Sequence, residues 1–175
     1  KMSFRKEKKY CLSLSDQFYI KDFLILEGMT KLHPSRKVIS CYMDNDGLDM
    51  FMQSEEGVLP RKKVRFRWYG GGTLYYKEIK ISSIEGRFKT NKLIKNIDAN
   101  QIAKVGLFDN EYGNLYSKLI VSYKREYYSF QNLRITFDTN IKYSLPNGTF
   151  DSKIYDEETV MEVKVSQSIH DDYIE

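Results

Sequence analysis

The feature that most constrains this chain is a run of cations placed at every second residue. Lys63, Arg65 and Arg67 alternate with apolar side chains, among them Phe66 and Trp68. Successive side chains of an extended strand point to opposite faces, so a strand here carries all three cations on one face and the aromatic rings on the other. Like charges on one face repel one another. The arrangement therefore indicates an anion that lies across the strand.

The composition is that of a strand-rich protein. The 175 residues include 14 Tyr and 10 Phe but only 3 Pro, which favours strands over a helical bundle or disorder. This length suits one hydrophobic core, and we expect residues 1–175 to form a single domain. No apolar run approaches the roughly 18 residues that a membrane helix needs, so we expect no membrane segment. The net charge of +4 does not by itself indicate a nucleic-acid partner.

Two cysteines, Cys11 and Cys41, lie far apart in the sequence. They form neither a disulfide framework nor a zinc-binding spacing. We therefore expect free thiols and a cytoplasmic protein.

Alternation and turn residues predict an α+β order of elements. Strands are expected at residues 5–12, 38–43, 62–69, 75–82, 117–128, 133–143 and 159–165. The three glycines 70–72 read as a hairpin connection. A helix is expected from Ser15 and Asp16 to about Gly28, with short helices within 91–97 and 99–105. Residues 44–60 fit either one helical turn or a loop.

Charged side chains share one face in further strands as well. An ordinary antiparallel sheet with a solvated polar face explains any single one of these strands. Repetition over six strands favours a second geometry, a barrel with a polar interior and an apolar outer face covered by helices. A lumen lined by cations needs an anionic occupant. In each of these strands the residues that share one face are Arg5, Glu7 and Lys9; Glu78 and Lys80; Tyr123, Arg125 and Tyr127; Arg134, Thr136 and Asp138; Glu162 and Lys164.

In this order and spacing the motifs resemble the VTC domain, the polyphosphate polymerase domain of the CYTH-like triphosphate tunnel metalloenzyme superfamily. The resemblance covers most of the chain. It is carried by Arg5-Lys6-Glu7-Lys8-Lys9-Tyr10, Ser40-x-Tyr42-x-Asp44, Lys63-x-Arg65-x-Arg67-x-Tyr69, Glu78-x-Lys80, Tyr123-x-Arg125, Arg134-Ile135-Thr136-x-Asp138 and Glu162-x-Lys164.

The resemblance implies an eight-stranded antiparallel β-barrel, a tunnel with a basic lumen and peripheral helices. It implies that Glu162 holds a divalent metal, Mn²⁺ or Mg²⁺, as a hard oxygen ligand. Arg87 is an alternative to the less secure Lys89. Glu7, Glu78 and Lys164 are accessory residues. Glu7 and Glu78 are either second carboxylates beside the metal or partners that hold the cations apart, and for Glu78 the partner role is preferred. The implied phosphate ligands are Lys9, Lys63, Arg65, Arg67, Lys80, Lys89, Arg125 and Arg134.

The implied function is phosphoryl transfer from ATP to a growing polyphosphate chain. The protein would position the reactants and neutralise charge, with no side chain as nucleophile. Two alternatives stay open: hydrolysis of tripolyphosphate or of a nucleoside triphosphate, and polyphosphate binding without catalysis. Trp68 points away from the cations of its strand, which argues against stacking on nucleic-acid bases. Nothing in the sequence indicates the oligomeric state.

The ends of the chain also depart from the family. The family continues after the last strand into a basic segment, and nothing after Lys164 matches that segment. Lys1 precedes Met2 as a remnant of cloning would. We therefore expect a chain that lacks the C-terminal segment. The eukaryotic complex of the family also has phosphate-sensing and membrane modules, and since neither is found in this sequence we expect a stand-alone bacterial member.

Overall fold

The computed structural model describes residues 7–95, 98–104, 106–146 and 154–165. Contacts divide the chain into two compact units. Where described, the first unit consists of Val38–Ser122 and Lys142–Ile154, and the second of Ser3–Lys37, Tyr123–Ile141 and Tyr155–Glu175. Each unit has a hydrophobic core of its own.

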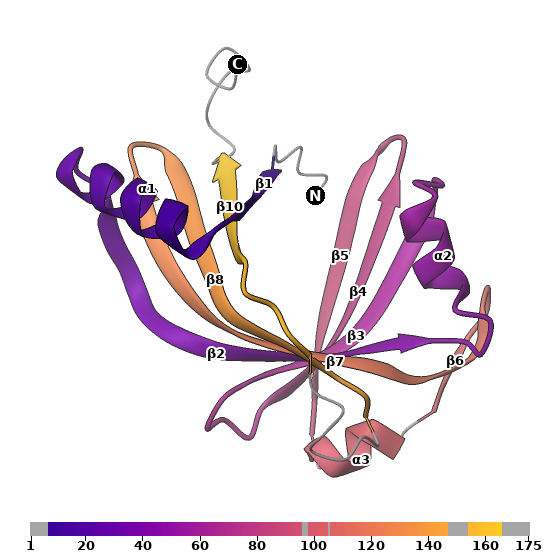
Figure 1. The fold of residues 1–175 in the computed structure, drawn as a ribbon. Coiled ribbons are helices and arrows are strands. Elements are labelled where there is room, and N and C mark those ends of the chain that lie inside the picture. Colours follow the sequence, from indigo (N-terminus) through magenta and orange to yellow (C-terminus); the bar gives the residue numbers. More distant parts are fainter. Residues whose placement is uncertain (1–6, 96–97, 105, 147–153, 166–175) are drawn as a thin grey trace. The chain divides into compact units, whose positions relative to one another are not determined.

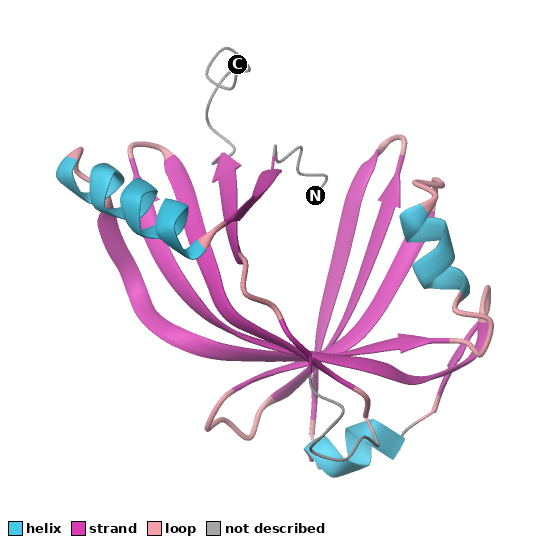
Figure 2. Ribbon diagram, viewed as in Figure 1, coloured by secondary structure: helices cyan, strands magenta, loops and turns pink. Residues whose placement is uncertain are grey.

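Strands make up most of the described chain (Figures 1 and 2). Three helices accompany them: α1 (Leu14–Leu26), α2 (Asp49–Glu55) and α3 (Ala99–Lys104). The strands are β1 (Glu7–Leu12), β2 (Thr30–Asp44), β3 (Arg61–Tyr69), β4 (Tyr75–Ser83), β5 (Gly86–Ile94), β6 (Leu107–Asp109), β7 (Gly113–Phe130), β8 (Leu133–Ser144), β9 (Ile154–Tyr155) and β10 (Thr159–Val165).

Eight of these strands pair in the order β1-β10-β8-β7-β2-β3-β4-β5, while β6 pairs with β7 and β9 with β8. This confirms the predicted antiparallel architecture with eight principal strands. The sheet is not closed as the predicted barrel would be. Strands β1 and β5 end the order, and no pairing joins them among the described strands. None of the helices in the described ranges is long and apolar enough to span a membrane.

The first unit is organised around the hairpin of β3 and β4. Gly71, in the connection, has a φ of +79°, a left-handed conformation that glycine adopts without strain. The amide of Gly72 donates a hydrogen bond of 2.9 Å to the carbonyl of Tyr69 and closes the turn. Strand β3 also pairs with β2, and β4 with β5, all antiparallel. The register of this hairpin fixes which charged side chains are neighbours.

Alternate residues of β3 build the core of the first unit. Val64, Phe66 and Trp68 are buried, and they cluster with Met50 of α2 and Ile102 of α3. The two short helices therefore contribute to the core on the apolar face of this strand. The cations of β3 have the opposite parity and project from the other face.

In the second unit, β10 lies between β1 and β8. Helix α1 begins after Ser13, whose hydroxyl accepts a hydrogen bond of 3.1 Å from the amide of Asp16. Leu24 of this helix packs against a core that contains Tyr128 and Phe137. On β1, β8 and β10, charged residues alternate with apolar residues that belong to this core or pack against it.

Most sequence-based expectations for the elements are confirmed, including the hairpin, the last strand and the helix near residue 99. Of the two possibilities for residues 44–60, the structure has a helix, α2. The cap of α1 is Ser13 rather than Ser15. The helix expected within 91–97 is wrong, because β5 occupies this region up to Ile94. Strand β5 is exposed along almost its whole length, so burial imposes no alternation on its sequence. Arg5 and Lys6 lie outside the described residues.

Candidate functional site

The first unit gathers its charged side chains on one face of four strands, which we call the cationic face. Ser40 and Tyr42 of β2 lie opposite Arg67 and Arg65 of β3. Paired residues of antiparallel strands project to the same side of a sheet, so the register defines the whole face. Its charged residues and the polar ones beside them include Ser40, Tyr42, Arg61, Lys63, Arg65, Arg67, Glu78, Lys80, Arg87 and Lys89.

Three lysines form a row across this face. Lys63 of β3 lies opposite Lys80 of β4, and Lys80 lies opposite Lys89 of β5. Like charges at directly opposite positions destabilise a sheet. The row therefore concentrates positive charge on this face and is suited to an anion that crosses all three strands.

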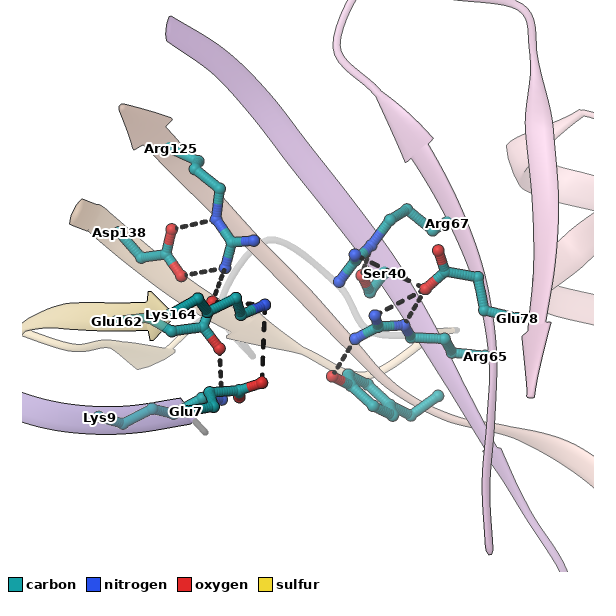
Figure 3. Close-up of polar contacts among 11 residues, drawn as sticks. Glu7, Lys9, Ser40, Arg65, Arg67, Glu78, Arg125, Asp138, Glu162 and Lys164 are labelled. Carbon is teal, nitrogen blue, oxygen red and sulfur yellow. Dashed lines mark hydrogen bonds and ion pairs between the residues drawn. The ribbon is translucent and has the colours of Figure 1, made fainter. Parts of the chain in front are cut away.

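Glu78 is the carboxylate on which the neighbouring cations converge (Figure 3). Its Oε2 accepts from Nε of Arg65 at 2.7 Å and lies 2.6 Å from Nη2 of the same guanidinium. Nη1 of Arg67 lies 3.6 Å from that oxygen, and Nζ of Lys89 lies 2.8 Å from Oε1. One buried carboxylate thus holds three cations in place.

The electrostatics of Glu78 follow from these contacts. Burial raises the pKa of its carboxyl, but the charge of Arg65, the hydrogen bond from Lys89 and the charge of Arg67 lower that pKa by more, below its ordinary value of 4.5. Glu78 is therefore ionised at neutral pH and balances only part of the positive charge around it.

Arg67 is the most buried cation of the face, with 9% of its surface exposed. Its Nε donates a hydrogen bond of 3.2 Å to Oγ of Ser40. Arg67 is therefore oriented from both neighbouring strands, by Ser40 of β2 and Glu78 of β4.

The second unit has a face of different character, which we call the mixed face. Register places Glu7, Lys164 and Arg134 in one row, and Lys9, Glu162 and Thr136 in the next. Arg134 is exposed, and its guanidinium lies 5.6 Å from the ring centre of Tyr127. Carboxylates and cations alternate on this face. Its members are Glu7, Lys9, Arg125, Arg134, Thr136, Asp138, Glu162 and Lys164.

Arg125 is held in a fork by Asp138 (Figure 3). Its Nε and Nη2 each donate to one carboxylate oxygen of Asp138, both at 2.6 Å. Nη2 also lies 3.9 Å from Oε2 of Glu162. A bidentate pair fixes the plane of a guanidinium, so Arg125 is oriented before any ligand binds.

Glu162 is 4% exposed and lies among three cations. Its oxygens are 3.2 Å from Nζ of Lys164 and 3.9 Å from both Nζ of Lys9 and Nη2 of Arg125. Burial raises the pKa of Glu162, but a hydrogen bond with Glu7 and the charges of Lys164 and Lys9 outweigh burial and lower the pKa to about 2. Glu162 is therefore anionic at neutral pH and offers hard oxygen donor atoms.

The hydroxyl of Thr136 has no hydrogen-bond partner among the described residues. Thr136 is 3% exposed and lies opposite Glu162 in the register of β8 and β10. An unsatisfied buried hydroxyl costs about 1–3 kcal/mol and calls for an explanation. The orphaned oxygen beside an ionised carboxylate is suited to a polar ligand.

The structure brings the predicted residues together in two groups. Lys63, Arg65, Arg67, Lys80, Lys89 and Glu78 share the cationic face, and Lys9, Arg125, Arg134, Glu162, Glu7 and Lys164 share the mixed face. Sequence reasoning assigned no role to Ser40, Tyr42, Thr136 or Asp138. Their parity matched that of charged neighbours, but the pairing partner of each strand was needed to place them.

Glu78→Gln should lower the free energy of unfolding by about 3 kcal/mol at neutral pH, because three cations lose their carboxylate. A carboxyl with a lowered pKa stabilises the fold above its ordinary pKa and loses this contribution as pH falls. The difference from wild type should therefore narrow below pH 4.5. Urea unfolding at several pH values measures this difference in the free energy of unfolding, and Glu85→Gln, at an exposed position, is the control. A constant difference between pH 3 and pH 7 would contradict this electrostatic role.

Comparison with known proteins places this arrangement in a family. No curated protein sequence matches the chain. Solved structures share its fold. A candidate adenylate cyclase of Bacillus halodurans is 15% identical with a TM-score of 0.59, and the match covers 94% of this chain and 80% of that one. A candidate adenylate cyclase of Vibrio parahaemolyticus is 14% identical with a TM-score of 0.55, and the match covers 99% of this chain and 80% of that one. A protein of Pyrococcus horikoshii is similar as well (13%, 0.53, 95% and 81%). The model of the VTC domain matches residues 4–175, so the chain belongs to the VTC domain family.

Proposed function

We propose that this protein is a metal-dependent phosphotransferase that binds a linear phosphate chain and extends it from ATP. The observation that carries the proposal is the row of Lys63, Lys80 and Lys89 beside the Arg65–Glu78 pair. Such a face is stabilised by a ligand that offers one negative charge after another. Membership of the VTC family supports the same ligand.

The chemistry of the face favours phosphate over nucleic acid. Polyphosphate has no bases or carbon skeleton to recognise, so guanidinium forks and ammonium groups are the available contacts. Trp68, the side chain best suited to stacking on a base, is 8% exposed and belongs to the core of the first unit. A sequence-neutral polyanion is therefore the better ligand.

In the proposed reaction a terminal oxygen of the polyphosphate attacks the γ-phosphorus of ATP, and the bond to the β-phosphate oxygen breaks to release ADP. Arg65, Arg67 and the lysine row would hold the phosphates and offset their mutual repulsion. No protein side chain forms a covalent intermediate. The contribution of the protein is orientation and charge neutralisation.

The mixed face fits a divalent cation that is shared with substrate. Among the described residues no group of three or more His, Cys, Asp or Glu side chains could hold a metal ion by itself. Mg²⁺ commonly takes only one or two carboxylates and completes its shell with water and substrate phosphates. Glu162 and Glu7, which share Lys164 as a neighbour, and the orphaned hydroxyl of Thr136 offer such a partial set of hard ligands. When bound, Mn²⁺ or Mg²⁺ would neutralise developing charge on phosphate oxygens.

The proposal predicts that purified protein incubated with ATP and Mn²⁺ forms long polyphosphate and an equivalent amount of ADP. Glu162→Ala should abolish chain growth, whereas exposed Glu157→Ala should not. Gel staining for polyphosphate and enzymatic assays for ADP and free phosphate measure the products.

The same assay separates the alternatives. Free phosphate without chains would replace the polymerase by a triphosphate hydrolase. Tripolyphosphate binding without turnover of ATP would leave a non-catalytic binding module.

Thr136→Val should weaken binding of tripolyphosphate in the presence of Mn²⁺ without lowering the free energy of unfolding. Valine removes a hydroxyl that has no partner among the described residues, so the fold loses no hydrogen bond. Thr159→Val is the matched control, because Oγ1 of the buried Thr159 donates a bond of 3.0 Å to Gln17. That variant should lose stability and keep its affinity. The reverse pattern would exclude Thr136 from the binding site.

A further inference from the structure

Tyr42 is a neutral side chain on a face of cations. It lies on β2 directly opposite Arg65, which in turn lies opposite Glu78. Nη1 of Arg65 is 3.0 Å from the phenol oxygen of Tyr42, and the same guanidinium lies 5.7 Å from the centre of its ring. The phenol therefore shares with Glu78 the task of orienting Arg65.

The hydrogen bond with Arg65 leaves the phenol hydrogen unused. Arginine has N–H donors and no acceptor, so in this bond the guanidinium donates and the phenol oxygen accepts. Among the described residues Tyr42 makes no other hydrogen bond that would engage its own O–H. The hydroxyl can thus donate to an acceptor that approaches Arg65 from outside the protein.

The groups that face the phenol are mostly positive. Arg65, Arg67 and Lys63 stand on β3, with Glu78 on β4 and Lys89 on β5. Burial raises the pKa of Tyr42, but the charge and hydrogen bond of Arg65 and the charges of Arg67 and Lys63 lower it by more, below its ordinary value of 10.0. The surrounding cations thus make the phenol a more acidic, and therefore stronger, hydrogen-bond donor.

We propose that Tyr42 is a phosphate-binding residue, whose hydroxyl donates a hydrogen bond to a phosphate oxygen held by Arg65. This inference rests on the proposed function and adds a neutral donor to the set of cations. A phosphate oxygen between a guanidinium and a phenol has two donors set by neighbouring strands, β2 and β3. The site would therefore fix the position of one phosphate along the chain rather than only attract a polyanion.

A pH dependence distinguishes this role from a purely orienting one. A phenolate cannot donate a hydrogen bond and repels phosphate, so deprotonation of Tyr42 should weaken binding. If Tyr42 only orients Arg65, its phenolate would hold the guanidinium at least as firmly as the neutral phenol does, and binding would not weaken.

Calorimetric titration with tripolyphosphate tests the inference on wild type, Tyr42→Phe and Tyr75→Phe. At pH 7 Tyr42→Phe should bind about ten-fold more weakly, as expected for a hydrogen bond to a charged group. Between pH 7 and pH 10 this ratio should fall towards one, in step with the tyrosinate absorbance that Tyr42→Phe lacks. Tyr75→Phe is the control, because the ring of Tyr75 packs 5.5 Å from Trp68 on the core side. It should match wild type throughout.

Two results would overturn the inference while leaving the proposed function intact: equal affinity of wild type and Tyr42→Phe at pH 7, or a weaker Tyr42→Phe whose ratio to wild type does not change with pH. Wild-type protein that fails to bind tripolyphosphate would instead remove the proposed function, and the inference with it. Thermal unfolding of Tyr42→Phe without ligand checks that its fold is preserved.

Discussion

The repulsion between cations held on one sheet face is the constraint on which the candidate site depends. Strand pairing leaves Lys63, Lys80 and Lys89 no freedom to separate their backbones, since each lies opposite the next. Glu78 relieves part of this repulsion by holding Arg65, Arg67 and Lys89. A sheet selected for stability alone would not place these residues together. The repulsion between the cations is understandable if an anion neutralises them when it binds.

The two units use the same strand geometry but differ in how carboxylates are distributed among their cations. In the first, three cations share a single buried carboxylate, and the face is suited to polyanions. In the second, each cation near Glu162 has carboxylate neighbours, and Arg125 is locked by Asp138. A surface that offers ionised oxygen ligands beside phosphate-binding cations is suited to a metal that bridges protein and phosphate. Under the proposed function, the cationic face therefore serves charge recognition and the mixed face is suited to metal binding.

Parity along single strands predicted much of this account. The cations of β3, β4 and β10 are on the expected faces because burial of Phe66, Ile79 or Val163 on the other side enforces alternation. Sequence failed where burial gives no such signal. Strand β5 and the first half of β2 are exposed. The end of β5 was therefore predicted to be part of a short helix within 91–97, and β2 was predicted as a strand of only six residues.

Contacts between strands could not be predicted from the sequence either. Tyr42 matters because it faces Arg65, and Thr136 because it faces Glu162, and both facts are properties of register. Asp138 stands 13 residues from Arg125 in sequence, yet it forms the tightest ion pair of the mixed face. Motif residues can be recognised one strand at a time, whereas their partners require the sheet.

The most direct test of the central claim compares two lysines of the same strand. Lys80 lies on the cationic face, whereas Lys77 has the opposite parity and lies opposite Phe66. Titration calorimetry with tripolyphosphate should find Lys80→Gln at least about ten-fold weaker than wild type and Lys77→Gln unchanged. Equal losses in the two variants would show that only net charge matters, and unchanged affinity in Lys80→Gln would contradict the claim that the lysine row binds phosphate.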